Sequence, residues 1–422
     1  KPTGAASSAP MNCDSPRPCR MPPADAPNTP MFSERTHWPL EVNELTRLTQ
    51  SRRELGLPVF DLTESNPTRC GFDYGDAALL EAFLNPRGLH YEPDPRGLLS
   101  ARQAVIEYYA GQGVALSPAQ IFLTASTSEA YSFIFRLLGD PGDELLVPRP
   151  SYPLFEFLTR LNDLSIAPYP LIYDGMWCMD RAAFADAVTS RARAVLVVHP
   201  NNPTGSHVSP EEAGFLAGFC ETNELPLIAD EVFFDYAFPG AAARRAPSFA
   251  GEKRMLTFTL NGLSKISALP QMKCAWVVVN GPERLLQGAL DRLEVIADTY
   301  LSLSTPVACA LPRLLNLRHT IQPQVLDRVT GNLARLDALL ALAPPVNRLN
   351  VEGGWYAVLR LPSTLSDEEW ALKLLREDGV LLHPGHFYDF TSEGHLVVSL
   401  LPQPEMFGEA VARLLARVRS DA

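Results

Sequence analysis

From about residue 98 the chain alternates short apolar runs with segments of helical periodicity. The run Ala194–His199 is rich in β-branched residues, as expected for a strand that is buried on both faces of a parallel sheet. This alternation predicts an α/β fold with a mostly parallel sheet flanked by helices. The other expected strands are 121–124, 144–147, 166–169, 227–229, 255–260 and 274–280, and the expected helices are 98–109, 127–138, 153–161 and 210–222.

The last part of the chain follows a different pattern. After a helix-rich stretch over 282–342, strand-like runs at 356–361 and 395–400 alternate with a helix near 367–377 and a final helix. This α+β order predicts a second, smaller domain, and 422 residues are enough for it at roughly 100–200 residues per domain. The expected division is an N-terminal segment at 31–75 that joins the small domain, a large domain at 76–310 and a small C-terminal domain at 311–422.

Residues 1–30 differ from the rest of the chain. Eight prolines lie between Pro2 and Pro30, mixed with Ala, Ser and Asp and with few apolar residues. Such a segment cannot bury enough surface to offset its chain entropy, so we expect a disordered tail. It has no apolar stretch of the kind that secretory signals carry, and no such signal is expected.

Charge and cysteine content exclude several classes of protein. The net charge is −12, from 36 Lys and Arg against 48 Asp and Glu, which argues against a nucleic-acid surface. No apolar run approaches the roughly 18–20 residues that a membrane helix needs. The seven cysteines form no CxxC pair, so neither a disulfide framework nor a zinc site is expected and no metal is predicted. A reducing, cytoplasmic location fits best.

Polar residues follow three of the expected strands. The first group, His199–Gly205, reads HisProAsnAsnProThrGly, and open α/β sheets bind ligands at the carboxyl ends of their strands. An ordinary turn uses the same residue types. The second group begins with Asp230, after the strand at 227–229. It is either a cap of the next element or a buried carboxylate kept ionised by a cationic partner, such as a protonated pyridine nitrogen.

The third group is Ser264-Lys265, after the strand at 255–260. Most lysines lie on the surface of a protein. Here small residues precede the lysine and apolar residues follow it, and a partly desolvated lysine at a strand end can form a Schiff base.

Taken together, the three groups resemble the class I/II aminotransferases, the fold-type-I enzymes that depend on pyridoxal phosphate. The order Asn202, Asp230, Lys265 matches, with spacings of 28 and 35 residues. The resemblance runs from about Trp38 to the C-terminus and implies a large domain that binds pyridoxal phosphate.

The resemblance also implies roles for individual residues. Lys265 would hold the cofactor as a Schiff base and move the substrate proton, and Asp230 would pair with the pyridinium nitrogen. Asn202 would donate to the 3′ oxygen of the ring, and Tyr152 would stack on the ring. The phosphate would be bound by Ser126, Thr127 and Ser128 at the start of a helix, by Ser264, and by Lys273. A plain helix cap would also explain the first three, and an ordinary half-buried tyrosine would explain Tyr152.

Two further segments resemble parts of the family's active site. Tyr91 matches a tyrosine that family members lend to the phosphate of the neighbouring subunit, which implies a homodimer with shared active sites. Asn66, in Asn66-Pro67-Thr68, matches the loop that closes over the substrate.

Four positions depart from the family's pattern. Phe233 replaces a tyrosine that donates to the 3′ oxygen, and Lys273 replaces an arginine that clamps the phosphate. Gly262 replaces a phosphate-binding serine. Val397 stands where the family places the arginine that binds the substrate carboxylate. Either the substrate lacks a carboxylate there or another cation binds it, for which the candidates are Arg69, Arg96, His383 and His386.

The function that follows is transfer of an amino group between an amino donor and a 2-oxo acid. A lyase or decarboxylase on the same scaffold is chemically close, because any of the bonds at the substrate α-carbon can break. The alternative outside the enzymes is a sensor that binds pyridoxal phosphate without catalysis. Such sensors carry a DNA-binding helix-turn-helix, and the Pro-rich segment at 1–30 is not expected to fold into one.

Overall fold

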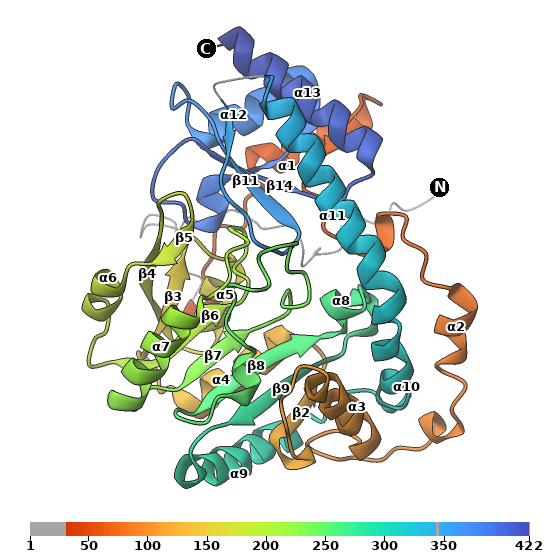
Figure 1. Cartoon of the computed structure of the whole chain (residues 1–422), viewed down its shortest axis with the longest axis vertical. Helices are drawn as coiled ribbons and strands as arrows, with labels where there is room; N and C mark the ends of the chain where they lie inside the picture. Colours follow the sequence, from red (N-terminus) through yellow and green to blue (C-terminus); the bar gives the residue numbers. More distant parts are fainter. Residues whose placement is uncertain (1–30, 343–345, 422) are drawn as a thin grey trace.

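The computed structural model describes residues 31–342 and 346–421, so the tail predicted at 1–30 lies outside the described residues. Its largest element is an eight-stranded sheet with the order β2-β9-β8-β7-β6-β3-β4-β5 (Figure 1). Neighbouring strands from β8 to β4 are parallel, whereas β9 and β5 run antiparallel to their neighbours. The predicted mostly parallel α/β sheet is therefore confirmed. Its strands are β2 (Ile121–Thr124), β3 (Glu144–Arg149), β4 (Ser165–Tyr173), β5 (Trp177–Met179), β6 (Ala192–Val198), β7 (Leu227–Asp230), β8 (Thr257–Gly262) and β9 (Ala275–Asn280).

Helices cover both faces of this sheet. On β6, Leu196 and Val198 pack in the core that includes α4 (Thr127–Leu138), α5 (Leu154–Leu161) and α9 (Glu283–Tyr300). Val195 and Val197 pack in the core that includes α7 (Pro210–Thr222). Because successive side chains of a strand point to opposite faces, burial on both faces explains the uninterrupted apolar run of β6. The remaining helices at this sheet are α3 (Leu99–Ala110), α6 (Arg181–Asp186), α8 (Leu263–Ile266) and α10 (Thr305–Asn316), with α2 (Asp76–Glu81) in the segment before α3.

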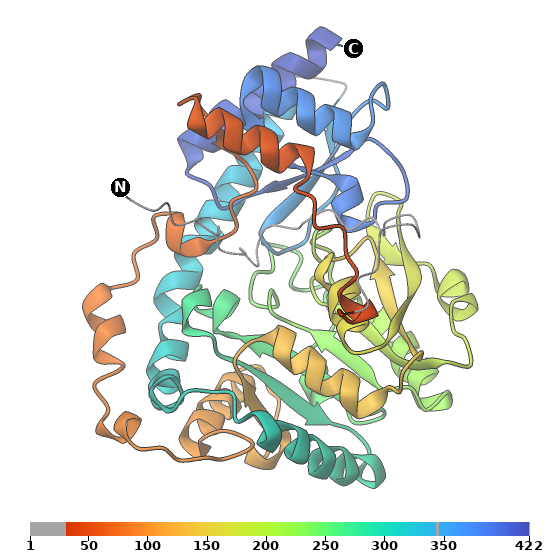
Figure 2. The ribbon, with the colours of Figure 1, turned by 180° about the vertical axis from the view of Figure 1, so that it is seen from behind.

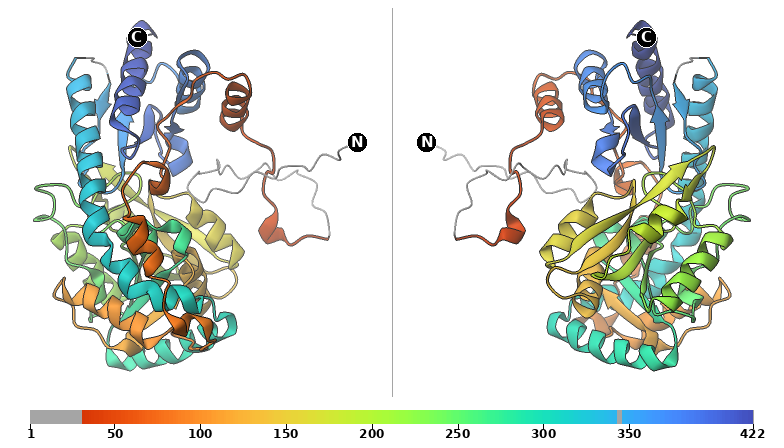
Figure 3. Two further views of the ribbon diagram at one scale, coloured as in Figure 1. Left: turned by 90° about the vertical axis from the view of Figure 1, so that its right-hand side faces the viewer. Right: turned by 90° about the vertical axis from the view of Figure 1, so that its left-hand side faces the viewer.

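A second, antiparallel sheet has the order β10-β11-β14-β13. It lies beyond the carboxyl edge of the large sheet, together with α1, α12 and α13, and α11 runs between the two parts of the molecule (Figures 1 and 3). The bounds are β10 (Asn347–Arg348), β11 (Tyr356–Arg360), β13 (His383–Pro384), β14 (His395–Ser399), α1 (Glu44–Glu54), α11 (Arg318–Leu340), α12 (Asp367–Lys373) and α13 (Pro404–Asp421). The α+β pattern predicted for the last part of the chain is present.

The N-terminal segment reaches this second part of the molecule. Strand β1 (Phe60–Asp61) pairs in parallel with β12 (Val380–Leu381), and α1 packs against α12 (Figure 2). These contacts are the ones expected of a segment that joins a small C-terminal domain. The boundaries at residues 76 and 311 stay predictions.

Some elements differ from the sequence-based expectations. The helix expected near 367–377 is α-helical only to Lys373; a single π-helical turn, Leu374–Asp378, follows and ends at Gly379. Gly379 has a φ of 74°, a conformation that glycine adopts without strain. In the described part of the chain, no helix is both long and apolar enough to cross a membrane.

Candidate active site

The carboxyl ends of β6, β7 and β8 open into a cavity of about 400 Å³. Because these strands are parallel neighbours, the residues that follow them meet at one edge of the sheet. The structure brings most of the predicted residues to this cavity: Asn66, Ser126, Thr127, Ser128, Tyr152, Asn202, Asp230, Ser264, Lys265 and Lys273.

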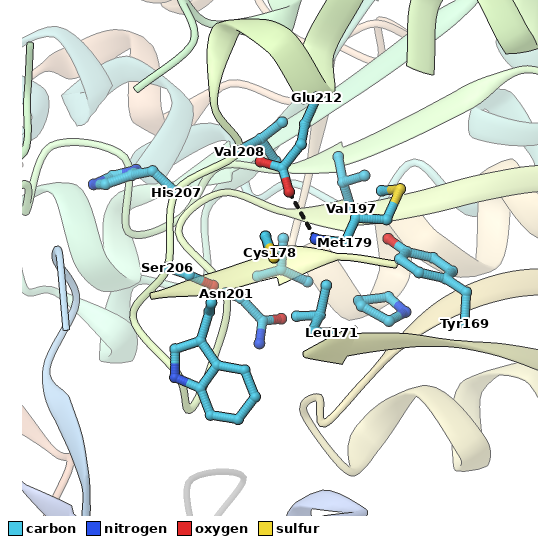
Figure 4. A pocket seen from close by; sticks show the side chains of 13 residues that line it. Tyr169, Leu171, Cys178, Met179, Val197, Asn201, Ser206, His207, Val208 and Glu212 are labelled. Carbon is cyan, nitrogen blue, oxygen red and sulfur yellow. Dashed lines mark hydrogen bonds between the residues drawn. The ribbon is translucent and has the colours of Figure 1, made fainter. Parts of the chain in front are cut away.

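A second cavity lies farther along the same sheet and is much smaller. Its volume is about 30 Å³, and its walls include Tyr169, Asn201, His207 and Glu212 (Figure 4). Glu212 accepts a hydrogen bond from the backbone N–H of Met179 at 2.7 Å, which fastens α7 to β5. This space holds about one water molecule. An open pocket of about 610 Å³ adjoins it and shares Trp177, His207 and Glu212, but none of the predicted site residues line it. The 400 Å³ cavity, which they do line, is therefore the candidate site for a cofactor and substrate.

Asn202 lies in a tight turn after β6. The turn is closed by hydrogen bonds from the Asn201 N–H to the Ser206 carbonyl and from the Gly205 N–H to the Asn201 carbonyl, each 2.8 Å. Gly205 has a φ of 67°, and a Cβ there would collide with Val351, so the turn requires glycine. Among the described residues, the buried Oδ1 of Asn202 has no hydrogen-bond partner. A buried unpaired amide oxygen beside a cavity is the signature of a polar ligand site.

Asp230 is the last residue of β7 and is buried in the cavity wall. Its Oδ2 accepts a hydrogen bond from the Tyr131 hydroxyl at 2.7 Å, and its Oδ1 accepts one from the Val232 N–H at 3.1 Å. Burial raises the pKa of the Asp230 carboxyl, whereas the two hydrogen bonds and the charge of Lys265 act in the opposite direction. The carboxylate is thus held in one orientation, with part of its surface facing the cavity.

Lys265 lies on α8, the single helical turn that follows β8. The hydroxyl of Tyr236 donates to the Lys265 carbonyl at 2.7 Å and fixes the backbone at this point. The Nζ atom lies 4.8 Å from the ring centroid of Trp355 and 5.4 Å from that of Phe233. The amine therefore faces aromatic rings inside the cavity wall and is not on the open surface.

The N-terminus of α4 forms another wall of the cavity. Ser126 is the N-cap and accepts a hydrogen bond from the Glu129 N–H at 3.1 Å. The first-turn N–H groups, the hydroxyls of Thr127 and Ser128, and the positive end of the helix dipole favour an anion here. Gly262 lines the same cavity, and a Cβ at that position would lie only 2.8 Å from the Ala275 Cβ, so no serine fits without a shift of the backbone.

Five predicted residues do not line the cavity within this chain: Tyr91, Arg69, Arg96, His383 and His386. Tyr91 is 75% exposed on the segment before α3. Arg96 donates to Glu294 Oε2 from Nη2 at 2.6 Å and stacks on the Phe122 ring, so its guanidinium is already paired. Arg69 follows the cavity-lining Thr68 but is largely exposed, with Nη1 3.9 Å from Glu64 Oε2.

The position of Val397 contains no cation. Val397 is buried on β14, opposite Val358 on one side and His383 on the other. Burial lowers the pKa of His383 to about 3, so this imidazole is neutral near pH 7, and its Nδ1 lies 3.2 Å from the Tyr388 hydroxyl. Lys265 and Lys273 are the cationic side chains in the cavity lining of the described chain.

Four aromatic residues at this site were not predicted from the sequence. Tyr356 on β11 and Tyr388 on the short helix after β13 line the cavity, Trp355 faces Lys265, and Tyr131 donates to Asp230. Only Tyr131 had a signal in the sequence. It lies four residues after Thr127 in a predicted helix, and residues with this spacing share one face of a helix.

Comparisons with known proteins agree with this geometry. Residues 71–414 match the family model described as aminotransferase class I and II. The glutamate-pyruvate aminotransferase AlaA of Haemophilus influenzae is 28% identical over 375 residues, which cover 87% of this chain and 92% of that protein. The alanine aminotransferase of Mycobacterium tuberculosis is 27% identical, with 85% of each chain covered. In fold, the structure of an alanine aminotransferase from Pyrococcus furiosus matches with a TM-score of 0.83 at 24% identity, covering 92% of this chain and all of that one.

Proposed function

This chain belongs to the class I and II aminotransferases, which depend on pyridoxal phosphate, and we propose that it uses Lys265 and Asp230 as its catalytic residues. The reaction is the transfer of an amino group from an amino donor to a 2-oxo acid. The lyase, decarboxylase and sensor alternatives are not favoured, because the similar proteins are named as aminotransferases. The names of these relatives support glutamate or alanine as donor and pyruvate as acceptor.

The residues of the cavity fit pyridoxal phosphate group by group. Lys265 offers an amine for its aldehyde, and the buried Asp230 carboxylate offers a partner for its ring nitrogen. Asn202 offers its amide N–H to the ring oxygen, and its buried Oδ1, which has no partner among the described residues, supports a polar group at this place that can donate to it. The N-terminus of α4, with Ser264 and Lys273, offers donors for the phosphate, and Tyr152 offers a ring for stacking.

The bound cofactor supplies an electron sink for the electron pair left at the substrate α-carbon. The chain's own residues do the rest. Lys265 Nζ would hold the cofactor and then carry the proton that leaves the α-carbon, and the rings of Trp355 and Phe233 shield one side of this amine from solvent. Asp230 stays ionised beside the ring nitrogen and keeps that nitrogen protonated. Asn66, on the segment that borders the cavity, would contact the substrate. Arg69, which lies beside Glu64 and outside the cavity lining, would bind the substrate carboxylate only after turning toward the cavity.

The observation that carries this proposal is the convergence of Asn202, Asp230 and Lys265 on one cavity from three neighbouring strands. Their side chains are separated by tens of residues in the sequence. An amide, a carboxylate and an amine at one sheet edge form a donor set that suits a substituted pyridine with an aldehyde.

We further propose that the enzyme is a cytoplasmic homodimer with shared active sites and with neither nucleic-acid nor membrane partners. Apolar side chains are exposed on α2, at Leu80, and on the segment between α2 and α3, at Leu84, Leu89 and Tyr91. Exposed apolar side chains gathered on one segment support an interface with a second copy. The division of the chain into the parts 31–75, 76–310 and 311–422 is also a proposal, which the pairing of β1 with β12 supports.

The test is a half-reaction with single amino donors. The protein loaded with pyridoxal phosphate is mixed with alanine, glutamate or a simple amine in the absence of an acceptor. We expect bound cofactor to be converted to pyridoxamine phosphate, with one carbonyl product formed for each cofactor converted. Alanine or glutamate would leave a 2-oxo acid, and a simple amine would leave an aldehyde or ketone. Release of carbon dioxide, or of ammonia without conversion of the cofactor, would contradict transamination.

A further inference from the structure

The buried pair of Tyr131 and Asp230 joins two walls of the cavity. Tyr131 is on α4, and Asp230 ends β7, 99 residues later in the chain. The hydroxyl donates to Asp230 Oδ2 at 2.7 Å, a short distance typical of a hydrogen bond to a charged oxygen. Among the described residues, Tyr131 is the side chain that donates to this carboxylate; the other donor is the backbone N–H of Val232.

The direction of this hydrogen bond is fixed by the two protonation states. Burial raises the pKa of Tyr131 well above 10, so the phenol keeps its proton at any working pH. An ionised carboxylate can only accept. The ionisable groups that bear on Asp230 are Tyr131 from α4, Lys265 from α8 and its own neighbour Glu231. Tyr131 and Lys265 favour the carboxylate, whereas burial opposes it.

The ring of Tyr131 is itself held in place. It contacts the ring of Phe155 edge-on, with 5.4 Å between the centroids, and lies 5.7 Å from the ring of Phe135. Phe155 in turn contacts the ring of Tyr152, which lines the cavity. A tyrosine packed on two sides cannot swing its hydroxyl away, so Asp230 Oδ2 keeps one position.

Helix α4 also presents its N-terminus to the cavity. Thr127 and Tyr131 are four residues apart and share one face of the helix, so the anion-binding turn and the donor to Asp230 belong to the same rigid element. The separation between these two groups is therefore set by one turn of helix and does not depend on loop conformation.

We propose that Tyr131 is a positioning residue that keeps Asp230 ionised and aimed at the cofactor's ring nitrogen, while the same helix binds the phosphate. This inference rests on the proposed role of Asp230. It assigns α4 a direct contact with the ligand at its N-terminal turn and an indirect one, through Tyr131 and Asp230, one helical turn later.

The test measures binding of pyridoxamine phosphate to the apoprotein, over about pH 5–9, by equilibrium dialysis. This ligand has no aldehyde, so its affinity reports the site without the covalent contribution of Lys265. In Tyr131→Phe the carboxylate loses a donor and takes up a proton more readily, so the fall in affinity at low pH should begin at a higher pH. We expect the dissociation constant to rise about 10-fold at the acid end and to approach that of the wild type as the pH rises.

Tyr169→Phe is the matched control. Tyr169 is equally buried, and its hydroxyl donates to a backbone carbonyl, that of Leu196, at 2.8 Å. Its loss destabilises the fold but should leave the pH profile of binding unchanged. A Tyr131→Phe profile that coincides with the wild type, or that is shifted equally at every pH, would overturn the inference. If Tyr131→Phe does not fold, 3-fluorotyrosine is placed at position 131 instead. Its phenol is a stronger acid and a stronger hydrogen-bond donor, so the pH profile of binding should move toward lower pH. An unmoved profile overturns the inference.

Asp230→Asn separates this inference from the proposed function. If Asp230→Asn binds pyridoxamine phosphate as tightly as the wild type at all pH values, the role of Asp230 itself is wrong. If Asp230→Asn loses affinity while Tyr131→Phe keeps the wild-type profile, Asp230 retains its role and only the role of Tyr131 is wrong.

Discussion

The Nζ atom of Lys265 lies 4.8 Å from the ring centroid of Trp355, so the amine that follows β8 of the large sheet is placed against an aromatic ring that precedes β11 of the second sheet. Trp355 is fully buried and directly precedes β11. Phe233 packs edge-on against the same indole, with 5.2 Å between the centroids. The surroundings of the amine therefore depend on how the two sheets meet.

The first prediction concerns Phe233, which lines the cavity and offers no hydroxyl. In Phe233→Tyr a phenol donor should stabilise an anionic oxygen on the bound ring, and the proton on the lysine–cofactor nitrogen should be held less tightly. A spectrophotometric titration of the loaded enzyme should then give a lower midpoint for Phe233→Tyr than for the wild type. Equal or reversed midpoints would refute this.

The matched control for that titration is Tyr236→Phe. The Tyr236 hydroxyl is bonded to the Lys265 carbonyl, and this residue does not line the cavity. It is therefore not the missing donor, and its removal should leave the midpoint unchanged.

The second prediction concerns Val397, which is buried opposite Val358 and His383. In Val397→Arg a guanidinium would enter this apolar surrounding without a carboxylate partner, at a cost of several kcal/mol. We expect a clear fall in Tm and no gain of turnover with alanine or glutamate. Val397→Met, which adds length without charge, should lose less stability. Increased turnover with these donors in a stable Val397→Arg enzyme would show that an arginine at this position still reaches the substrate.

The third prediction concerns the pH dependence of stability. Burial raises the pKa of Glu231 from 4.5 to about 8, although Ser248 and the Phe249 N–H both donate to its carboxylate. Because the folded state holds this proton more tightly, the contribution of Glu231 is full below pH 4.5 and is lost as the pH rises through about 8. Between these two pH values the free energy of unfolding of the wild type, measured with urea, should fall by up to about 5 kcal/mol because of Glu231. Glu231→Gln should not show this fall. Glu409→Gln, at an exposed position, serves as the control. If the free energy of unfolding depends on pH identically in both variants, the raised pKa of Glu231 is contradicted.

The sequence predicts best those elements whose ends carry strong local signals. The expected bounds of β2, α4 and α7 match the structure residue for residue. Helix α7 begins with Ser209 as N-cap, Pro210 in its first turn and a reciprocal hydrogen bond from Glu212, which together mark a helix start in any context. By contrast, β8 begins two residues later than expected and continues through Asn261 and Gly262, because these residues pair with Trp276 and Ala275 of β9. A partner strand is invisible to local periodicity.

Some residues of the candidate site can likewise be predicted from local sequence, and others cannot. Residues directly after a buried strand, such as Asn202, Asp230 and Lys265, could be predicted because parallel strands bring their ends together. Trp355, Tyr356 and Tyr388 lie on or beside the strands of the second sheet, and no local motif shows which residues of this region face the cavity. Local motifs can also predict a contact that is not made. Arg96 was a candidate for binding the substrate, but its guanidinium is paired with Glu294, a residue 198 positions away.

The fourth prediction tests the shared active site. If Tyr91 completes the phosphate site of a second copy, Tyr91→Phe and Lys265→Ala enzymes should each be nearly inactive. Mixing the two under conditions of subunit exchange should form heterodimers with one site that is intact in both elements, and activity should return. Activity no higher than that of the separate variants, after exchange has been verified by mass, would count against a shared site.

The most direct test of the account is to locate the lysine that binds pyridoxal phosphate. The loaded enzyme is reduced with borohydride, digested and mapped by mass spectrometry. We predict a label on Lys265, loss of the label and of the visible absorbance in Lys265→Ala, and retention of the label in Lys273→Ala, which removes the other lysine of the cavity lining. A label on a different lysine of the wild type, or a label that persists in Lys265→Ala, would contradict the account.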